Sequence, residues 1–168
     1  RLIEANRPGM EPRLFSPRQR NLEHDIDHLG NQFFVRTNKN APNFRLMSTP
    51  LENTGEEHWK EVIPAREGVY LSSFEVFRNF LVVVERRDAL KRIRIRNSRN
   101  EWHELDFGEP TYATRLGNNA VMETEVLRFN FESMRTPDSV FDYNMRTRKK
   151  TLLKENRVLG GFDRSNYL

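Results

Sequence analysis

Cysteine is absent from this sequence of 168 residues, which excludes disulfide bridges and thiolate metal sites. Long apolar runs are missing too, since the longest, Phe80 to Val84, is far shorter than the roughly 18 residues of a membrane-spanning helix. The N-terminus lacks the apolar stretch of a signal peptide and begins with Arg1 rather than Met. We therefore expect a segment of a longer protein, without membrane contact, in a reducing, cytoplasmic setting.

A large excess of one charge is also missing. The 28 Lys and Arg residues are set against 24 Asp and Glu residues, so the net charge is only +4. Such a balance supports no more than weak attraction to polyanions. Leu, Ile, Val and Phe together exceed the roughly 20% below which chains stay disordered, so we expect one folded domain with a lean core.

The sequence does contain apolar residues that alternate with polar ones, which is the pattern of a β-strand. Val126 to Phe131 (VLRFNF) places three apolar side chains on one face, and Lys91 to Arg96 (KRIRIR) places two isoleucines on one face. Phe80 to Val84 (FLVVV) is apolar on both faces, as in a strand between two layers. No segment has convincing helical periodicity, so the predicted fold class is all-β.

These strands recur in groups of four. Aligning the second strand of each group brings Phe33, Phe80 and Leu127 into register, and aligning the fourth strands matches Trp59 with Trp102. Four strands in about 45 residues are typical of one propeller blade. A β-sandwich of many short strands is the alternative, and the regular recurrence favours the propeller. The predicted blades are 21–67, 68–110 and 111–162.

Three blades are too few to close a ring, because propellers have roughly four to eight. We expect residues 1–20 to supply the closing strand of a preceding blade, at RLFSPRQ. A partial propeller leaves two blade faces without a neighbour, and we expect those faces to be apolar. The chain should therefore self-associate or form one part of a larger molecule.

Several motifs resemble one known family. SMRTPDSVFDYNM (Ser133 to Met145), followed by a basic stretch and GFDRSNY (Gly161 to Tyr167), is similar to the last propeller blade of the oligopeptidase B (protease II) branch of the prolyl oligopeptidase family. Phe80 to Ile95 and Glu23 to Leu46 resemble the two blades before it. The resemblance implies the later blades of a propeller, with 163–168 as a hinge toward a hydrolase domain that this sequence lacks.

The same resemblance implies a function for the whole parent protein. In that family the propeller covers a serine peptidase site and admits short peptides, which the hydrolase domain cleaves after Arg or Lys. The parent's catalytic domain is then the first expected partner of this chain, and short peptides reach the site through the parent. A free-standing propeller that binds a protein partner is the alternative, since fold does not fix function.

We expect no catalytic, cofactor or metal site within the chain. The sequence contains no G-x-S-x-G motif, and His and Asp cluster only at His24 to His28 (HDIDH). On a strand, His24 and His28 lie roughly 13 Å apart, too far to share a zinc ion. Asp25 and Asp27 should point to the opposite face from the two histidines, which argues against a His–Asp dyad.

Other candidate sites have simpler structural interpretations. KRIRIR and RTRKK (Arg146 to Lys150) are candidate phosphate-binding patches, yet neither has interleaved exposed aromatics, so we expect no nucleic-acid binding. Trp59 and Trp102 recur at equivalent blade positions, which favours packing over ligand binding. One set of carboxylates either lines a tunnel for cationic peptides or is simply exposed: Glu56, Glu57, Glu61 and Asp106.

Overall fold

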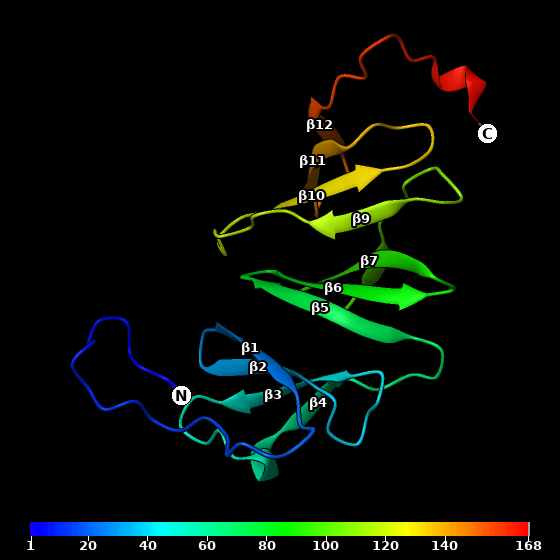
Figure 1. The fold of residues 1–168 in the computed structure, drawn as a ribbon. Helices are drawn as coiled ribbons and strands as arrows, with labels where there is room; N and C mark the ends of the chain where they lie inside the picture. The colour runs from blue at the N-terminus through cyan, green and yellow to red at the C-terminus, as the bar shows by residue number, and fades with distance from the viewer. Residues whose placement is uncertain (168) are drawn as a thin grey trace. The chain divides into compact units, whose positions relative to one another are not determined.

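The computed structural model describes residues 1–167, which divide into two compact units, Arg1–Glu67 and a unit that begins at Gly68. Twelve β-strands and two short 3-10 helices form the regular structure (Figure 1). The all-β prediction is confirmed. Among the described residues we find no helix with the length and apolar character needed to span a bilayer.

The first unit contains one four-stranded antiparallel sheet in the order β1-β2-β3-β4. A two-residue turn joins β1 to β2, and Gly30 at its first position has φ +60°, a left-handed conformation that glycine adopts without strain. The elements are β1 (His24–Leu29), β2 (Gln32–Thr37), β3 (Arg45–Pro50), the 3-10 helix η1 (Glu56–His58) and β4 (Lys60–Ile63).

The second unit contains two four-stranded sheets, each antiparallel and each in chain order. The second sheet consists of β5 (Tyr70–Phe77), β6 (Phe80–Arg87), β7 (Leu90–Asn97) and β8 (Trp102–Glu104). The third consists of β9 (Ala113–Leu116), β10 (Val126–Glu132), β11 (Ser139–Asn144) and β12 (Lys150–Glu155), and the 3-10 helix η2 (Arg164–Asn166) follows.

Three separate sheets exclude the sandwich alternative, because a sandwich stacks two larger sheets. Each sheet is a four-stranded antiparallel meander, the form of a propeller blade. One sheet lies within each of the expected ranges 21–67, 68–110 and 111–162. Residues 1–167 therefore supply three blade-like sheets, one in the first unit and two in the second.

Strand burial follows the apolar pattern of the sequence. In β10, Leu127, Phe129 and Phe131 are buried while Arg128 is exposed, as alternation predicts. Six consecutive residues of β6, from Phe80 to Glu85, are buried on both faces. The two patterns therefore distinguish a strand that packs on one face from a strand that is covered on both.

The core of the second unit lies between its two sheets. Val82 and Val84 of β6 and Ile93 and Ile95 of β7 belong to one buried cluster with the apolar face of β10. Two phenylalanine rings, Phe107 and Phe131, are stacked there with centroids 5.1 Å apart. This face-to-face packing of neighbouring sheets is how propeller blades are stabilised.

The other face of the third sheet is mostly polar. Arg128 donates to both carboxylate oxygens of Asp142 at 2.8 and 2.9 Å, and Arg115 lies 3.7 Å from Asp138. The expectation of a large apolar surface at this sheet is therefore wrong. The reason is the alternation in β10, which puts Leu127, Phe129 and Phe131 on its inner face and leaves only Val126 among its apolar residues on the outer face.

Residues 1–20 form no strand in the structure. They make a single antiparallel bridge between Leu2 and Arg13, and Phe15 inserts into a cluster with Val35 and Met47 of the first sheet. A closing strand needs the other strands of its own sheet, and residues 1–167 do not supply them. The assignment of this segment to a preceding blade stays a prediction.

The expected hinge, 163–168, contains a short turn of 3-10 helix. Asp163 caps this turn, because its carboxylate accepts a hydrogen bond from the Ser165 amide at 2.9 Å. Leu168 lies outside the described residues. The role of this segment as a connection to a hydrolase domain stays a prediction.

Candidate functional site

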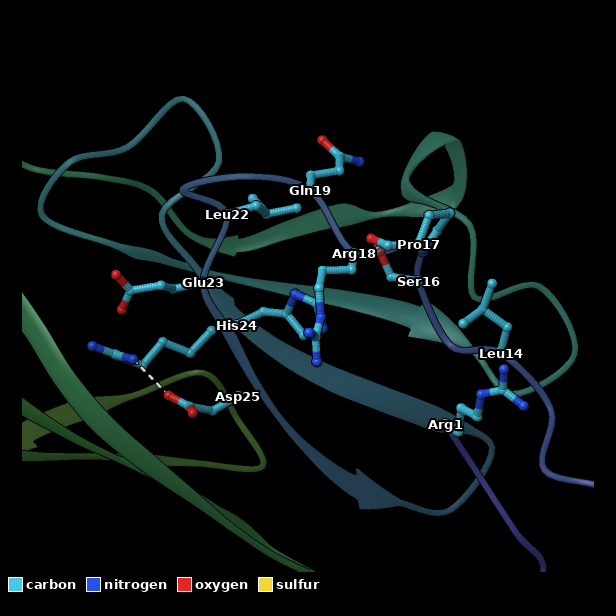
Figure 2. A pocket seen from close by; sticks show the side chains of 11 residues that line it. Arg1, Leu14, Ser16, Pro17, Arg18, Gln19, Leu22, Glu23, His24 and Asp25 are labelled. Atoms are coloured by element: carbon cyan, nitrogen blue, oxygen red, sulfur yellow. Dashed lines mark hydrogen bonds and ion pairs between the residues drawn. The ribbon is translucent and has the colours of Figure 1, made fainter.

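A hollow of about 670 Å³ lies between the N-terminal segment and β1 of the first unit (Figure 2). We call it the histidine hollow, because it contains His24 and Asp25 from the one cluster of His and Asp in the sequence. It also has three arginines, Arg1, Arg18 and Arg36. Its remaining lining residues are Leu14, Ser16, Pro17, Gln19, Leu22 and Glu23.

The His24 ring packs among aromatic side chains. Its centroid lies 5.9 Å from the Phe15 ring and 6.3 Å from the Trp59 ring. Its Nδ1 atom is buried and makes no hydrogen bond within the described residues. Ser16 also lines the hollow, but its hydroxyl donates weakly to the Pro17 carbonyl at 3.4 Å. His24 is thus held by ring packing, without a carboxylate to orient it.

Asp25 has a different partner. The antiparallel register pairs Asp25 with Arg36 of β2, and the Arg36 guanidinium donates to the Asp25 carboxylate at 2.6 Å. The same guanidinium lies 3.7 Å from the centroid of the Phe44 ring, so it is held between a charge and an aromatic face. Because Asp25 is paired with Arg36, it does not orient the His24 imidazole as a catalytic dyad would.

His28 lies away from His24. Its Nε2 atom is 2.9 Å from the Gly30 carbonyl, and its ring is 5.5 Å from the Phe33 ring. It borders a separate hollow of about 710 Å³ with apolar residues such as Leu2. Among residues 1–167, no group of three or more His, Asp or Glu side chains is placed to hold a metal ion.

Each of the candidate tunnel carboxylates has a local partner. Glu56 pairs with Lys39 and accepts from the Gln19 amide at 2.8 Å. Glu61 lies 3.4 Å from the Arg45 guanidinium, and Glu57 lies 3.6 Å from the His58 ring. The Asp106 carboxylate accepts a hydrogen bond from the Gly108 amide at 2.8 Å. These contacts give the carboxylates structural roles, while a steering role toward cationic peptides stays a prediction.

The arginines of KRIRIR lie along one face of β7. Arg92 donates to Glu104 at 2.7 Å, and Arg94 donates to the buried Glu85 at 3.1 Å. Arg94 and Arg96 also lie over the Trp102 ring, at 4.5 and 5.7 Å from its centroid. Ion pairing leaves little of this charge for phosphate contacts, so the result supports the interpretation as a structural strand face.

The two tryptophans share a blade position but not an environment. Trp59 donates from its indole nitrogen to the Thr54 carbonyl at 3.0 Å and packs against the cluster around Phe15. Trp102 instead lies beneath the arginines of β7. Both are half-buried packing residues, and neither lines the histidine hollow.

Sequence reasoning missed the histidine hollow itself and the role of Arg36. Nothing in the alternation of apolar residues shows that the N-terminal segment covers β1. One usable signal was the two-residue turn at Gly30 and Asn31, which fixes the β1–β2 register and therefore places Asp25 opposite Arg36.

Comparison with known proteins adds the wider context. A family model described as "Prolyl oligopeptidase, N-terminal beta-propeller domain" matches residues 1–156. Dipeptidyl aminopeptidase BI of Pseudoxanthomonas mexicana is 33% identical over 165 residues, which cover 96% of this chain and 23% of that protein. Protease 2 of Moraxella lacunata is 26% identical over 166 residues, which cover 99% of this chain and 24% of that protein.

Solved structures agree with this result. Oligopeptidase B from Leishmania major superposes with a TM-score of 0.79 and 26% identity, over 89% of this chain and 22% of that chain. Oligopeptidase B from Trypanosoma brucei, in a closed form with covalently bound antipain, superposes with a TM-score of 0.82 and 25% identity. The match covers 90% of this chain and 23% of that chain. The chain thus spans about a quarter of the length of these relatives.

Proposed function

Because the chain belongs to the prolyl oligopeptidase family and matches its N-terminal β-propeller domain, we propose that it is part of the gate of a serine oligopeptidase. The gate acts by size: a narrow channel excludes folded proteins and lets short peptides pass. The observation that carries this proposal is the match to the propeller model over residues 1–156.

The chemistry belongs to another part of the parent protein. The His24 imidazole and the Asp25 carboxylate have separate partners, and Ser16 hydrogen-bonds its neighbouring carbonyl. We assign the reactive serine to a hydrolase domain, which would act after Arg or Lys as in the oligopeptidase B branch that the chain resembles. The purified chain should leave arginyl and lysyl model substrates uncut. Turnover that survives repeated purification would contradict this assignment.

We assign the first strand of each sheet, β1, β5 and β9, to the central channel that propeller blades surround. Support comes from the third sheet, where all six residues of the fourth strand, β12, are exposed, as expected for the outer edge of a blade. The location of the parent protein in the cytoplasm is part of this proposal, in keeping with the absence of cysteine.

The gate can be tested in the parent enzyme by loosening the packing of two blades. Leu127→Ala removes a fully buried side chain between the second and third sheets. We expect cleavage of a long Arg-containing polypeptide to rise relative to cleavage of a short peptide with the same Arg. Arg128→Ala, one residue away on the exposed face, is the matched control and should leave this ratio unchanged.

The assay should be run where circular dichroism shows both variants folded. An unchanged ratio in Leu127→Ala would argue against gating by the blades. The coding sequence beyond Leu168 provides an independent test: a downstream G-x-S-x-G serine supports the peptidase assignment, and a stop codon supports the free-standing interaction module.

We also propose that the isolated chain self-associates, because a partial propeller leaves blade faces without the neighbours that normally cover them. The polar outer face of the third sheet reduces this tendency at that sheet. Sedimentation velocity over a range of concentrations measures it. A monomer at high concentration would oppose this proposal.

A further inference from the structure

A smaller hollow in the second unit is bordered by three arginines. Its volume is about 300 Å³, and it lies where the β5–β6, β7–β8 and β11–β12 turns supply residues to one site. Arg99 comes from the β7–β8 turn, and Arg146 and Arg148 come from the β11–β12 turn. We call this site the arginine hollow.

The two arginine-bearing turns are held by asparagine side chains in the same way. The Asn97 side-chain oxygen accepts from the amides of Arg99 and Glu101, at 2.9 and 3.0 Å. The Asn144 side-chain oxygen accepts from the amides of Arg146 and Thr147, at 3.0 and 2.7 Å. Both turns are therefore fixed before any ligand arrives, which lowers the entropy lost on binding.

Each turn also has a non-glycine residue in the left-handed region. Asn100 has φ +63° and Arg148 has φ +61°. Asparagine tolerates this conformation, whereas a long side chain such as arginine is disfavoured there. The β11–β12 turn thus places a guanidinium at a position where glycine would give a more stable backbone.

The charges around the arginine hollow are not balanced. Arg146 donates to Glu125 at 2.6 Å, and Glu101 accepts from the Asn97 side-chain amide at 2.8 Å. The guanidinium groups of Arg99 and Arg148 make no ion pair in the part of the chain that the structure describes. Glu101 also lines the hollow and keeps its negative charge, so the two guanidinium groups outnumber one carboxylate and leave the hollow with a net positive charge.

His103 also borders the arginine hollow and does not add to its charge at neutral pH. Burial, and then the nearby Arg148, lower the pKa of this imidazole below its usual value. The cationic character of the site therefore comes from its guanidinium groups, which stay charged at any ordinary pH.

We propose that the arginine hollow binds a small oxyanion, a phosphate or a carboxylate, through Arg99 and Arg148. The planar guanidinium fork matches two oxygens of either group with charge-assisted hydrogen bonds. The hollow is large enough for an anion of this size and too small for a folded partner. This inference is independent of the proposed gate, because it depends on the turns and not on the channel.

Isothermal titration of the full 168-residue chain with inorganic phosphate at low salt tests the proposal. Arg148→Gly should weaken phosphate binding by about tenfold or more, since it removes one charged hydrogen-bonding group. The same variant should raise the thermal unfolding midpoint, because glycine relieves the left-handed backbone. A loss of binding with a gain in stability separates a binding role from a folding defect.

Asn100→Gly is the matched control, because it relieves the same backbone conformation in the other turn without changing a charge. It should raise the unfolding midpoint and leave the phosphate affinity unchanged. Arg99→Gln should weaken binding by a similar factor to Arg148→Gly. Saturable phosphate binding that is unaltered in both arginine variants, or no saturable binding at all, would overturn the proposal.

A second titration distinguishes the two candidate ligands, a peptide carboxylate and a phosphate. N-acetylglycine offers a carboxylate like a peptide C-terminus, and N-acetylglycinamide is the same molecule without the charge. Binding of N-acetylglycine that is lost in Arg148→Gly and absent for the amide identifies a peptide carboxylate as the ligand. Binding of phosphate alone, with the same sensitivity to Arg148, identifies a phosphate site.

Discussion

The second and third sheets have the same topology, but they differ in how many of their faces are buried. Val82 and Val84 of β6 face the third sheet, and the alternate residues Leu81 and Val83 are equally buried. In the third sheet only one face is buried, and the opposite face has the Arg128–Asp142 pair. The same four-stranded meander can therefore be buried on two faces or on one, and the apolar pattern of its strands decides which.

The ion pairs of the two sheets follow the same difference. Arg94 pairs with Glu85, whose carboxylate side chain is only 2% exposed, whereas Arg128 and Asp142 are 46% and 24% exposed. A buried charge without its partner is costly, while an exposed pair contributes little. Substitutions in each sheet should therefore differ in effect even where the contacts have similar geometry.

The largest effect is expected from Phe129→Ala, which opens the core that the two sheets share. Phe129 is fully buried and touches both Phe107 and Phe141. The cavity and the lost apolar burial should lower the free energy of unfolding by about 4 kcal/mol, measured by urea denaturation. A loss below about 1 kcal/mol would mean that the two sheets do not depend on this core.

Arg94→Ala should be next in size. It removes a cation that hydrogen-bonds the buried Glu85 carboxylate and should lower the free energy of unfolding by about 3 kcal/mol. The double variant Arg94→Met with Glu85→Met removes both charges and should recover most of this loss. A single variant as stable as the parent chain would mean that the buried Glu85 carboxylate does not depend on Arg94.

At the β6–β7 turn of the second sheet we expect a smaller change in the free energy of unfolding, and here the change is an increase. Asp88 and Ala89 both have positive φ, +52° and +64°, as a two-residue type I′ turn requires. Ala89→Gly should raise the free energy of unfolding by about 1 kcal/mol, because glycine adopts this conformation without steric cost. Ala113→Gly, at the start of β9, has no such benefit and should not stabilise the chain.

The smallest effect is expected from Arg128→Ala on the exposed face of the third sheet. Its bond to Asp142 raises the pKa of the arginine, yet both side chains are solvated, so the pair adds little net stability. The thermal unfolding midpoint should stay unchanged at high salt. A clear drop at high salt would show that this face is covered in solution, and would remove the difference between the two sheets.

The strands and their repeat were predictable, while the hollows were not. The uniform apolar run of β6 and the alternation of β10 specify burial directly, because side chains in a strand alternate between two faces. The hollows depend on loops: Phe15 covers β1 from a segment without strand structure, and Arg148 reaches its site from a turn. Loop paths follow from tertiary packing, which local periodicity does not encode.

The pairing of candidate site residues was predictable in part. Alternation placed the His24 ring and the Asp25 carboxylate on opposite faces, and the structure gives them separate partners. It did not predict that Arg36 pairs with Asp25, since that contact depends on the register between two strands.

The exposed outer strand β12 has a consequence for handling the isolated chain. Its free backbone edge has two adjacent leucines, Leu152 and Leu153, each 49% exposed. Lys150 and Lys154 flank them, and lysine on a bare edge discourages strands of other molecules from adding to it. We expect these two lysines to oppose strand addition at this edge, so acetylating them should shorten the lag time before the chain forms cross-β aggregates.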